Sequence, residues 1–138
     1  MNRVIHFEIH AKDLDVMQLF YQYVFGWDIK NIGPHMSGYR VVVTGRNEQY
    51  SKWPGINGGI TPRQGNTPNE NSPLNAFVCI IDVEDIDDTL EKIASAGGAV
   101  VTNKTDVHGV GQLAYRKDPD GNIFGVLQPV KAIVSNDF

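Results

Sequence analysis

The chain has 138 residues, of which 41% are hydrophobic and 20% charged, and its formal net charge is -4. This length and composition are typical of one globular domain with its own core. Lysines and arginines are scattered along the chain, which argues against nucleic acid or an anionic membrane as the partner. Cys79 is the single cysteine, so no disulfide forms within the chain. No apolar run reaches membrane-spanning length, and we expect a cytoplasmic protein.

The first part of the chain predicts a strand, a helix and three more strands. Residues 4–10 alternate apolar and titratable side chains, the period-two pattern of a strand with one apolar and one polar face. The polar face carries His6, Glu8 and His10. Asp13 precedes apolar residues at helical spacing, so we expect it to cap a helix that ends near Gly26. The further strands are predicted over 27–32, 39–44 and 56–61.

The same pattern starts again after a linker at 62–75 that is rich in Pro, Asn and Gly. An apolar strand is predicted over 77–81, and Asp85 precedes a second helix that ends at Gly97-Gly98. Sliding the sequence along itself places Ile9 on Ile81, Asp13 on Asp85 and Gly26 on Gly98. We therefore predict an internal duplication. The remaining strands are predicted over 99–101, 113–116 and 123–127.

The segment from Lys117 to Asn122, read as KDPDGN, resembles both a metal loop and a turn. Pro119 presets a turn dihedral and Gly121 tolerates positive φ, which suits a hairpin between the last two strands. A calcium loop of the EF-hand type needs Gly at its sixth position and Glu at its twelfth. Counted from Asp118, the glycine comes fourth and the twelfth residue is Pro129. The sequence favours the structural turn.

Taken together, these features resemble the vicinal oxygen chelate superfamily, the family of glyoxalase I, extradiol dioxygenases and bleomycin resistance proteins. The resemblance covers nearly the whole chain up to Gln128. It rests on the residues Ile5 to Ile9, Asp13, Phe20-Tyr21, Phe25 to Trp27 and Asp118 to Asn122. It implies an α+β fold with duplicated βαβββ modules that form a curved mixed sheet enclosing a cup, and a homodimer. The implied organisation is a single domain at 1–129, with module one at 1–61, the linker at 62–75, module two at 76–129 and a tail at 130–138.

Metal-using members of this family hold a divalent ion with His or Glu residues from the first and last strands of each half. His6 matches the first of these positions, whereas its repeat counterpart is Val78. The last strand of the first half, 56–61, contains no Asp or Glu, and four residues after Gly121, where those enzymes carry Glu, stands Gly125. The polar residues of 4–10 cannot surround an ion alone, because same-face neighbours along a strand are ~6.6 Å apart. We expect no metal cofactor, unless a partner chain completes the site.

The resemblance leaves two classes of function open. In the first, the protein binds a small molecule in an apolar cup without metal, as the drug-sequestering members do. In the second, it is an enzyme that uses His6 or Glu8 as a general base, or a metal-dependent lyase, isomerase or dioxygenase of the glyoxalase type. The residues expected to line the ligand are His6, Glu8, Trp53, Val78, Gly125 and Leu127.

Three other residues have a chemistry that needs an assignment. Cys79 lies in an apolar run, and we expect a buried, inert side chain. His108 lies in a predicted loop, and solvent exposure is expected more than a position at the mouth of the cup. Trp53 either stacks on a ligand or fills the edge of the core.

Overall fold

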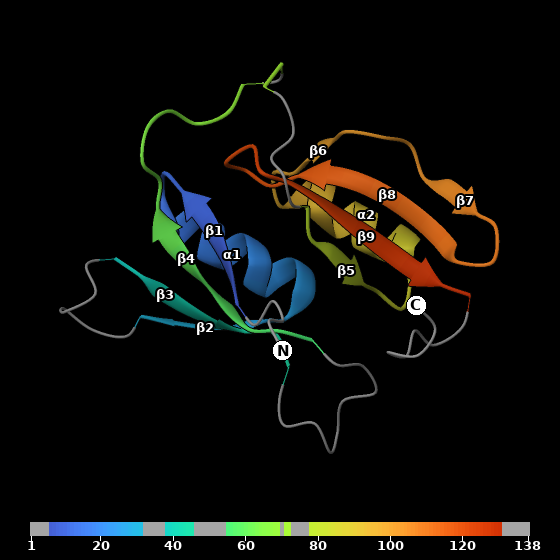
Figure 1. The fold of residues 1–138 in the computed structure, drawn as a ribbon, viewed down its shortest axis with the longest axis horizontal. Coiled ribbons are helices and arrows are strands. Elements are labelled where there is room, and N and C mark those ends of the chain that lie inside the picture. The colour runs from blue at the N-terminus through green and yellow to red at the C-terminus, as the bar shows by residue number, and fades with distance from the viewer. Residues whose placement is uncertain (1–5, 32–37, 46–54, 70, 73–77, 131–138) are drawn as a thin grey trace, which may run out of the picture. The chain divides into compact units, whose positions relative to one another are not determined.

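The computed structural model describes residues 6–31, 38–45, 55–69, 71–72 and 78–130. The chain divides into two compact units, with the boundary between Thr67 and Pro68. We call the part before this boundary unit 1 and the part after it unit 2. Each unit contains one helix and one mixed sheet (Figure 1). The predicted α+β class is therefore confirmed, and each half of the chain has a sheet of its own.

Unit 1 is a βαβββ module, as the sequence predicts. Its elements are β1 (Phe7–Ala11), α1 (Leu14–Phe25), β2 (Asp28–Asn31), β3 (Arg40–Val43) and β4 (Gly58–Pro62). The strand order is β1-β4-β3-β2, with β1 parallel to β4 and the other neighbours antiparallel. The strands β2, β3 and β4 lie within two residues of their predicted ranges, and β1 ends one residue later than predicted. The first two residues of the predicted strand at 4–10 lie outside the described residues.

Helix α1 is capped by Asp13 at its N-terminus and ended by Gly26 at its C-terminus. The Asp13 carboxylate accepts hydrogen bonds from the backbone N–H groups of Asp15 and Val16, which would otherwise lack partners in the first turn. Gly26 ends the helix with φ of 70°, a left-handed conformation that favours glycine. The helix packs on the sheet through apolar side chains. The buried residues of this layer are Met17, Phe20, Tyr21, Val24, Ile29, Val42 and Ile60.

Unit 2 has the same plan with one strand more. Its elements are β5 (Ile80–Asp82), α2 (Ile86–Ser95), β6 (Ala99–Val100), β7 (Thr105–Val107), β8 (Gly111–Lys117) and β9 (Ile123–Pro129). The order is β5-β9-β8-β6, with β7 also paired to β8, and β5 is parallel to β9. This order matches that of unit 1 and supports the predicted duplication. The sequence did not predict β7, because its short polar run has no alternation and its pairing with β8 is non-local.

The second helix reproduces the capping of the first. The Asp85 carboxylate accepts a hydrogen bond from the Asp88 N–H, as the repeat predicts. The glycine with φ of 95° after α2 is Gly97, one residue earlier than the repeat register implies. The core of unit 2 lies between α2 and the sheet, and its best buried residues are Ile86, Ile93, Ala114, Phe124 and Val126.

Cys79 corrects one prediction, because its side chain is exposed rather than buried. The strand β5 begins at Ile80, later than the predicted start at 77, and it is the edge strand of its sheet. A residue just before an edge strand has a neighbour on one side only, so apolar sequence context alone does not bury it. Its thiol is still partly desolvated, which raises its pKa and disfavours the reactive thiolate.

The KDPDGN segment forms the predicted turn between β8 and β9. The Asp118 carboxylate is buried and accepts hydrogen bonds from the backbone N–H groups of Asp120 and Asn122 and from the Asn122 side chain. Gly121 adopts φ of 86°. The carboxylate that suggested a metal loop is thus used to hold the turn together.

Candidate functional site

In each unit the helix covers one face of the sheet, and we call the other the open face. In unit 1 the side chains that face α1 alternate along β1 with side chains of the open face. The β1 residues Phe7 and Ile9 are half-buried, whereas His6, Glu8 and His10 are exposed. This confirms the predicted division of β1 into an apolar and a titratable face.

The open face of unit 1 carries a polar cluster formed by His6, Tyr39 and Glu8. The His6 Nε2 atom lies 2.9 Å from the Tyr39 hydroxyl oxygen. The pKa of Tyr39 is raised, first by desolvation and then by the charge of Glu8 and a side-chain hydrogen bond with it. The phenol therefore stays protonated. It contacts both His6 and Glu8, which lie two residues apart on the same face of the strand. We call these three residues the His6–Tyr39–Glu8 cluster.

Gly59 makes room for this cluster. In β4 it pairs with Glu8 of β1 on one side and with Val41 of β3 on the other. A Cβ atom added to Gly59 would overlap the ring and hydroxyl of Tyr39. The tyrosine can reach His6 and Glu8 only because β4 has no side chain at this position.

The open face of unit 2 also has a tyrosine beside a last-strand glycine, but its chemistry is different. Gly125 of β9 pairs with Ile80 of β5 and with Tyr115 of β8. A Cβ atom at Gly125 would lie 3.1 Å both from Ile80 Cγ1 and from Tyr115 Cε1. Two residues further along β9, Leu127 pairs with Asp82 and Leu113. The face is thus lined mainly by apolar and aromatic groups, and Ile80 is 49% exposed.

These contacts test whether the family's divalent metal fits the residues of this chain. At a metal site, a histidine must present an unprotonated ring nitrogen ~2.0–2.1 Å from the ion. The Nε2 atom of His6 is instead hydrogen-bonded to the Tyr39 hydroxyl, and the space over Gly59 is filled by the same ring. Over Gly125, Tyr115 and Ile80 leave only a tight contact of 3.1 Å for a side chain to begin. Among the described residues, no group of three or more His, Cys, Asp or Glu side chains is arranged to hold an ion. The residues do not fit the family's metal.

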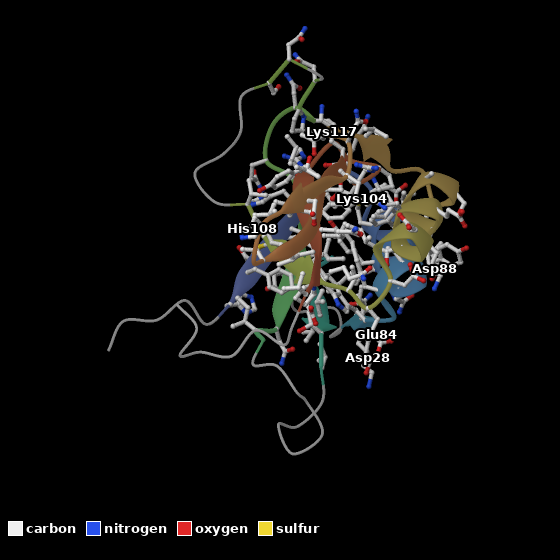
Figure 2. All side chains as sticks on the ribbon, turned by 90° about the vertical axis from the view of Figure 1, so that its right-hand side faces the viewer. Asp28, Glu84, Asp88, Lys104, His108 and Lys117 are labelled. Carbon is white, nitrogen blue, oxygen red and sulfur yellow. The ribbon has the colours of Figure 1, made fainter. Side chains whose placement is uncertain are left out.

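The structure places most of the predicted site residues, in two sets. His6 and Glu8 are brought together in unit 1, and Gly125 and Leu127 share the open face of unit 2. Val78 precedes β5 and is half-buried. Trp53 lies outside the described residues. His108 is exposed in the turn between β7 and β8, as expected (Figure 2).

Tyr39 is the residue that sequence reasoning missed. It lies just before β3, far from His6 along the chain, and it belongs to a stretch in which it reads only as a strand-forming aromatic. A usable signal was present in the Gly58-Gly59 pair. A glycine inside a strand often marks the close approach of another group, and here that group is the phenol.

Comparison with known proteins identifies the family of this fold. The model of the Glyoxalase/Bleomycin resistance protein/Dioxygenase superfamily matches residues 3–126. The chain belongs to this superfamily, as the resemblance in its sequence implies. No helix within the described ranges is long and apolar enough to cross a membrane.

The chain is similar to several proteins of this superfamily. A glyoxalase/bleomycin resistance protein/dioxygenase family enzyme from Burkholderia phytofirmans superposes with a TM-score of 0.68 at 19% identity, over 91% of this chain and 97% of that one. A mutant of the fosfomycin resistance protein FosX from Listeria monocytogenes, solved with Mn(II) and 1S,2S-dihydroxypropylphosphonic acid, superposes with a TM-score of 0.69 at 16% identity, over 94% of each chain. At these identities the likeness concerns the fold.

The similarity to a curated relative is local. A putative glyoxylase, CFP32 of Mycobacterium tuberculosis, is 47% identical over 47 residues. This match spans 34% of the present chain and 18% of the relative.

Proposed function

We propose that this protein binds a small organic molecule at the open face of a sheet, without a metal ion held at the family's ligand positions. One observation carries the proposal: in each unit a tyrosine fills the space over a last-strand glycine, Tyr39 over Gly59 and Tyr115 over Gly125. By the family resemblance, Gly125 stands at the position of a metal ligand, and Gly59 lies in the strand that should supply another. The open face of unit 1 offers hydrogen-bonding groups, and the open face of unit 2 offers apolar contact.

The relatives support the kind of ligand in general terms. FosX was solved with a small organic phosphonic acid, so in that protein this fold holds a molecule of low molecular weight. We extend this to the present chain as part of the proposal. A homodimer and a cytoplasmic location also belong to the proposal, the first because the family often pairs its modules between chains.

The alternative is a metal-dependent lyase, isomerase or dioxygenase of the glyoxalase type whose site uses other ligands or a second chain. Its support is that His6 matches the family's first-strand ligand and that Glu8 lies on the same face of β1. For an ion to bind His6 Nε2 and Glu8 together, Tyr39 would have to leave both groups.

Metal content separates the two candidates. We would purify the chain without a His tag, measure bound metal by mass spectrometry, and record the melting temperature with EDTA and with added Ni²⁺, Zn²⁺, Mn²⁺ or Fe²⁺. The proposal expects no stoichiometric metal and no specific shift. A site filled at one hundred times its Kd would stabilise the fold by about 2.7 kcal/mol, and such a shift would contradict the proposal.

A binding screen then tests the ligand itself. We would measure the melting temperature with a panel of uncharged aromatic and aliphatic compounds, and then the Kd of each hit by calorimetry. His6→Ala should weaken binding several-fold while leaving the fold intact, because His6 is exposed. The matched control is His108→Ala, which removes an exposed histidine from the turn of unit 2. Equal affinity in parent and His6→Ala would remove His6 from the site.

A further inference from the structure

The direction of the hydrogen bonds in the His6–Tyr39–Glu8 cluster follows from the number of protons available. An ionised carboxylate only accepts hydrogen bonds, and a phenol has a single proton to donate. Because Glu8 is hydrogen-bonded to Tyr39, the phenol proton is used on the carboxylate. The Tyr39 oxygen then offers only lone pairs to its other neighbour, His6 Nε2, at 2.9 Å.

His6 must therefore be the donor to Tyr39, with its proton on Nε2. In a neutral imidazole one nitrogen donates and the other accepts. The proton on Nε2 leaves Nδ1 of His6 as a bare acceptor, and the hydrogen-bond chain to Glu8 holds the ring in this tautomer. Such partner-imposed tautomers are how proteins prepare a histidine for a defined contact.

The charges around the cluster are unbalanced towards the negative. On strand β2, Lys30 forms an exposed ion pair with Asp28 at 3.6 Å, so these two charges sum to zero. The remaining groups of the same face nearest to Glu8 along the strands are His10, Thr61 and Val41. No unpaired lysine or arginine lies beside Glu8 on these paired strands of unit 1, within the described ranges. An anionic guest would meet the Glu8 charge.

We propose that the cluster selects a ligand whose polar end is an uncharged hydrogen-bond donor, a hydroxyl or an N–H group, which donates to His6 Nδ1. This inference rests on the proposed function and names the chemistry of the guest. The selected class differs from the phosphonic acid that accompanies Mn(II) in the FosX structure, because the Glu8 carboxylate of the cluster would repel an anion.

Three probes with one aromatic body test this selectivity. 4-Nitrobenzyl alcohol carries a neutral donor, its methyl ether lacks the donor, and 4-nitrobenzoate carries an anion. One hydrogen bond corresponds to about threefold to tenfold in Kd. We expect the parent protein to bind the alcohol about threefold to tenfold more tightly than the ether, and the benzoate most weakly. Equal binding of alcohol and ether, or tighter binding of the benzoate, would overturn the proposal.

The variants assign the preference to the cluster. His6→Ala should bind alcohol and ether equally. Glu8→Gln should reduce the discrimination against the benzoate, because it removes the charge and keeps an acceptor for Tyr39. Tyr39→Phe keeps a ring over Gly59 and removes only the hydroxyl, so it should reduce the alcohol preference. The control Tyr23→Phe changes an exposed tyrosine of α1 and should leave all three affinities unchanged. Unaltered preferences in His6→Ala would contradict the assignment.

A second measurement needs no ligand. Long-range ¹H–¹⁵N NMR spectra, recorded where the His6 ring is neutral, should show the proton on Nε2 and a bare Nδ1 in the parent, with a changed signal in Tyr39→Phe. A proton on Nδ1 would overturn the inference.

Failure of the proposed function is distinguishable from failure of this inference. If the proposed function is wrong, no probe or screening compound binds. If only the inference is wrong, ligands bind without a preference for a hydrogen-bond donor.

Discussion

The two units share one fold and present opposite chemistry on their open faces. At equivalent positions of the first strand, unit 1 has His6 and Glu8 where unit 2 has Val78 and Ile80. Next to the covered glycine of the last strand, Thr61 in unit 1 corresponds to Leu127 in unit 2, since each follows its glycine by one alternation. The difference shows that duplication preserved the backbone plan while each copy acquired its own surface.

The layer between sheet and helix shows a second exchange between the units. In unit 1, Phe7 pairs with Gly58, and a Cβ atom on that glycine would overlap the Phe7 ring and its backbone carbonyl. In unit 2, Phe124 precedes Gly125 as Gly58 precedes Gly59, and its neighbour across the sheet is Cys79. The phenylalanine is therefore on the first strand in unit 1 (Phe7) and on the last strand in unit 2 (Phe124). In both units its ring belongs to the layer between the sheet and the helix.

The largest expected loss of stability comes from removing the ring of Phe124. Phe124 is 4% exposed, so Phe124→Ala should cost about 3–5 kcal/mol of unfolding free energy through the cavity it leaves. Phe7 is only half-buried, and Phe7→Ala should cost clearly less. Urea unfolding followed by tryptophan fluorescence and circular dichroism measures both. Equal losses of unfolding free energy in Phe124→Ala and Phe7→Ala would mean that the two rings stabilise their units equally, despite their different burial.

The next largest loss of stability is expected from adding a side chain at Gly58, which lies beside Phe7. Gly58→Ala should destabilise the protein by about 1–3 kcal/mol, because the new Cβ meets the Phe7 backbone and ring. Gly45→Ala is the matched control, since a Cβ there has no atom within 4 Å and its φ is not positive. An unchanged unfolding midpoint in Gly58→Ala would show that β1 and β4 shift apart at little cost.

The helix caps give a smaller difference between the units. Asp13 accepts two backbone hydrogen bonds and Asp85 accepts one. We expect Asp13→Ala to cost about 1–2 kcal/mol and Asp85→Ala about 0.5–1 kcal/mol. Substitution by Asn, which retains a capping oxygen, is the control at each position. Urea unfolding measures both losses of stability. A larger loss in Asp13→Ala than in Asp85→Ala would show that the second hydrogen bond of Asp13 contributes to stability.

The smallest effect concerns Asp82, which stands in unit 2 where unit 1 has His10. Burial, and then the charge of Glu84, raise the pKa of Asp82. A carboxyl group with a raised folded-state pKa favours the fold fully below its ordinary pKa and loses that contribution as pH rises through the raised value. Asp82→Asn should therefore stabilise the protein at neutral pH, by less than about 0.5 kcal/mol because the group is largely exposed. The melting temperature of Asp82→Asn should exceed that of the parent at neutral pH and not in acid. Asp106→Asn, on exposed β7, is the control.

Much of the fold was predictable from short-range patterns. The alternation of 4–10, the capping residues Asp13 and Asp85, and the turn at 118–122 all depend on contacts within a few residues. The internal repeat added the expectation that both halves have the same order of elements, whereas the parallel pairing of the first and last strands of each unit was not predicted. Short strands without an apolar face, such as β7, were not predictable, because only their partner strand defines them.

The sequence by itself determined the modules, their helix ends and the absence of carboxylates from the family's last-strand positions, because these follow from residue identity and local spacing. Only the tertiary structure decided what occupies the space those carboxylates leave. Tyr39 meets His6 and Glu8 through the pairing of β1, β4 and β3, and Tyr115 meets Gly125 through β8 and β9. Such contacts join residues far apart in the chain, and the closeness of a ring to a glycine depends on strand register, which no local pattern encodes.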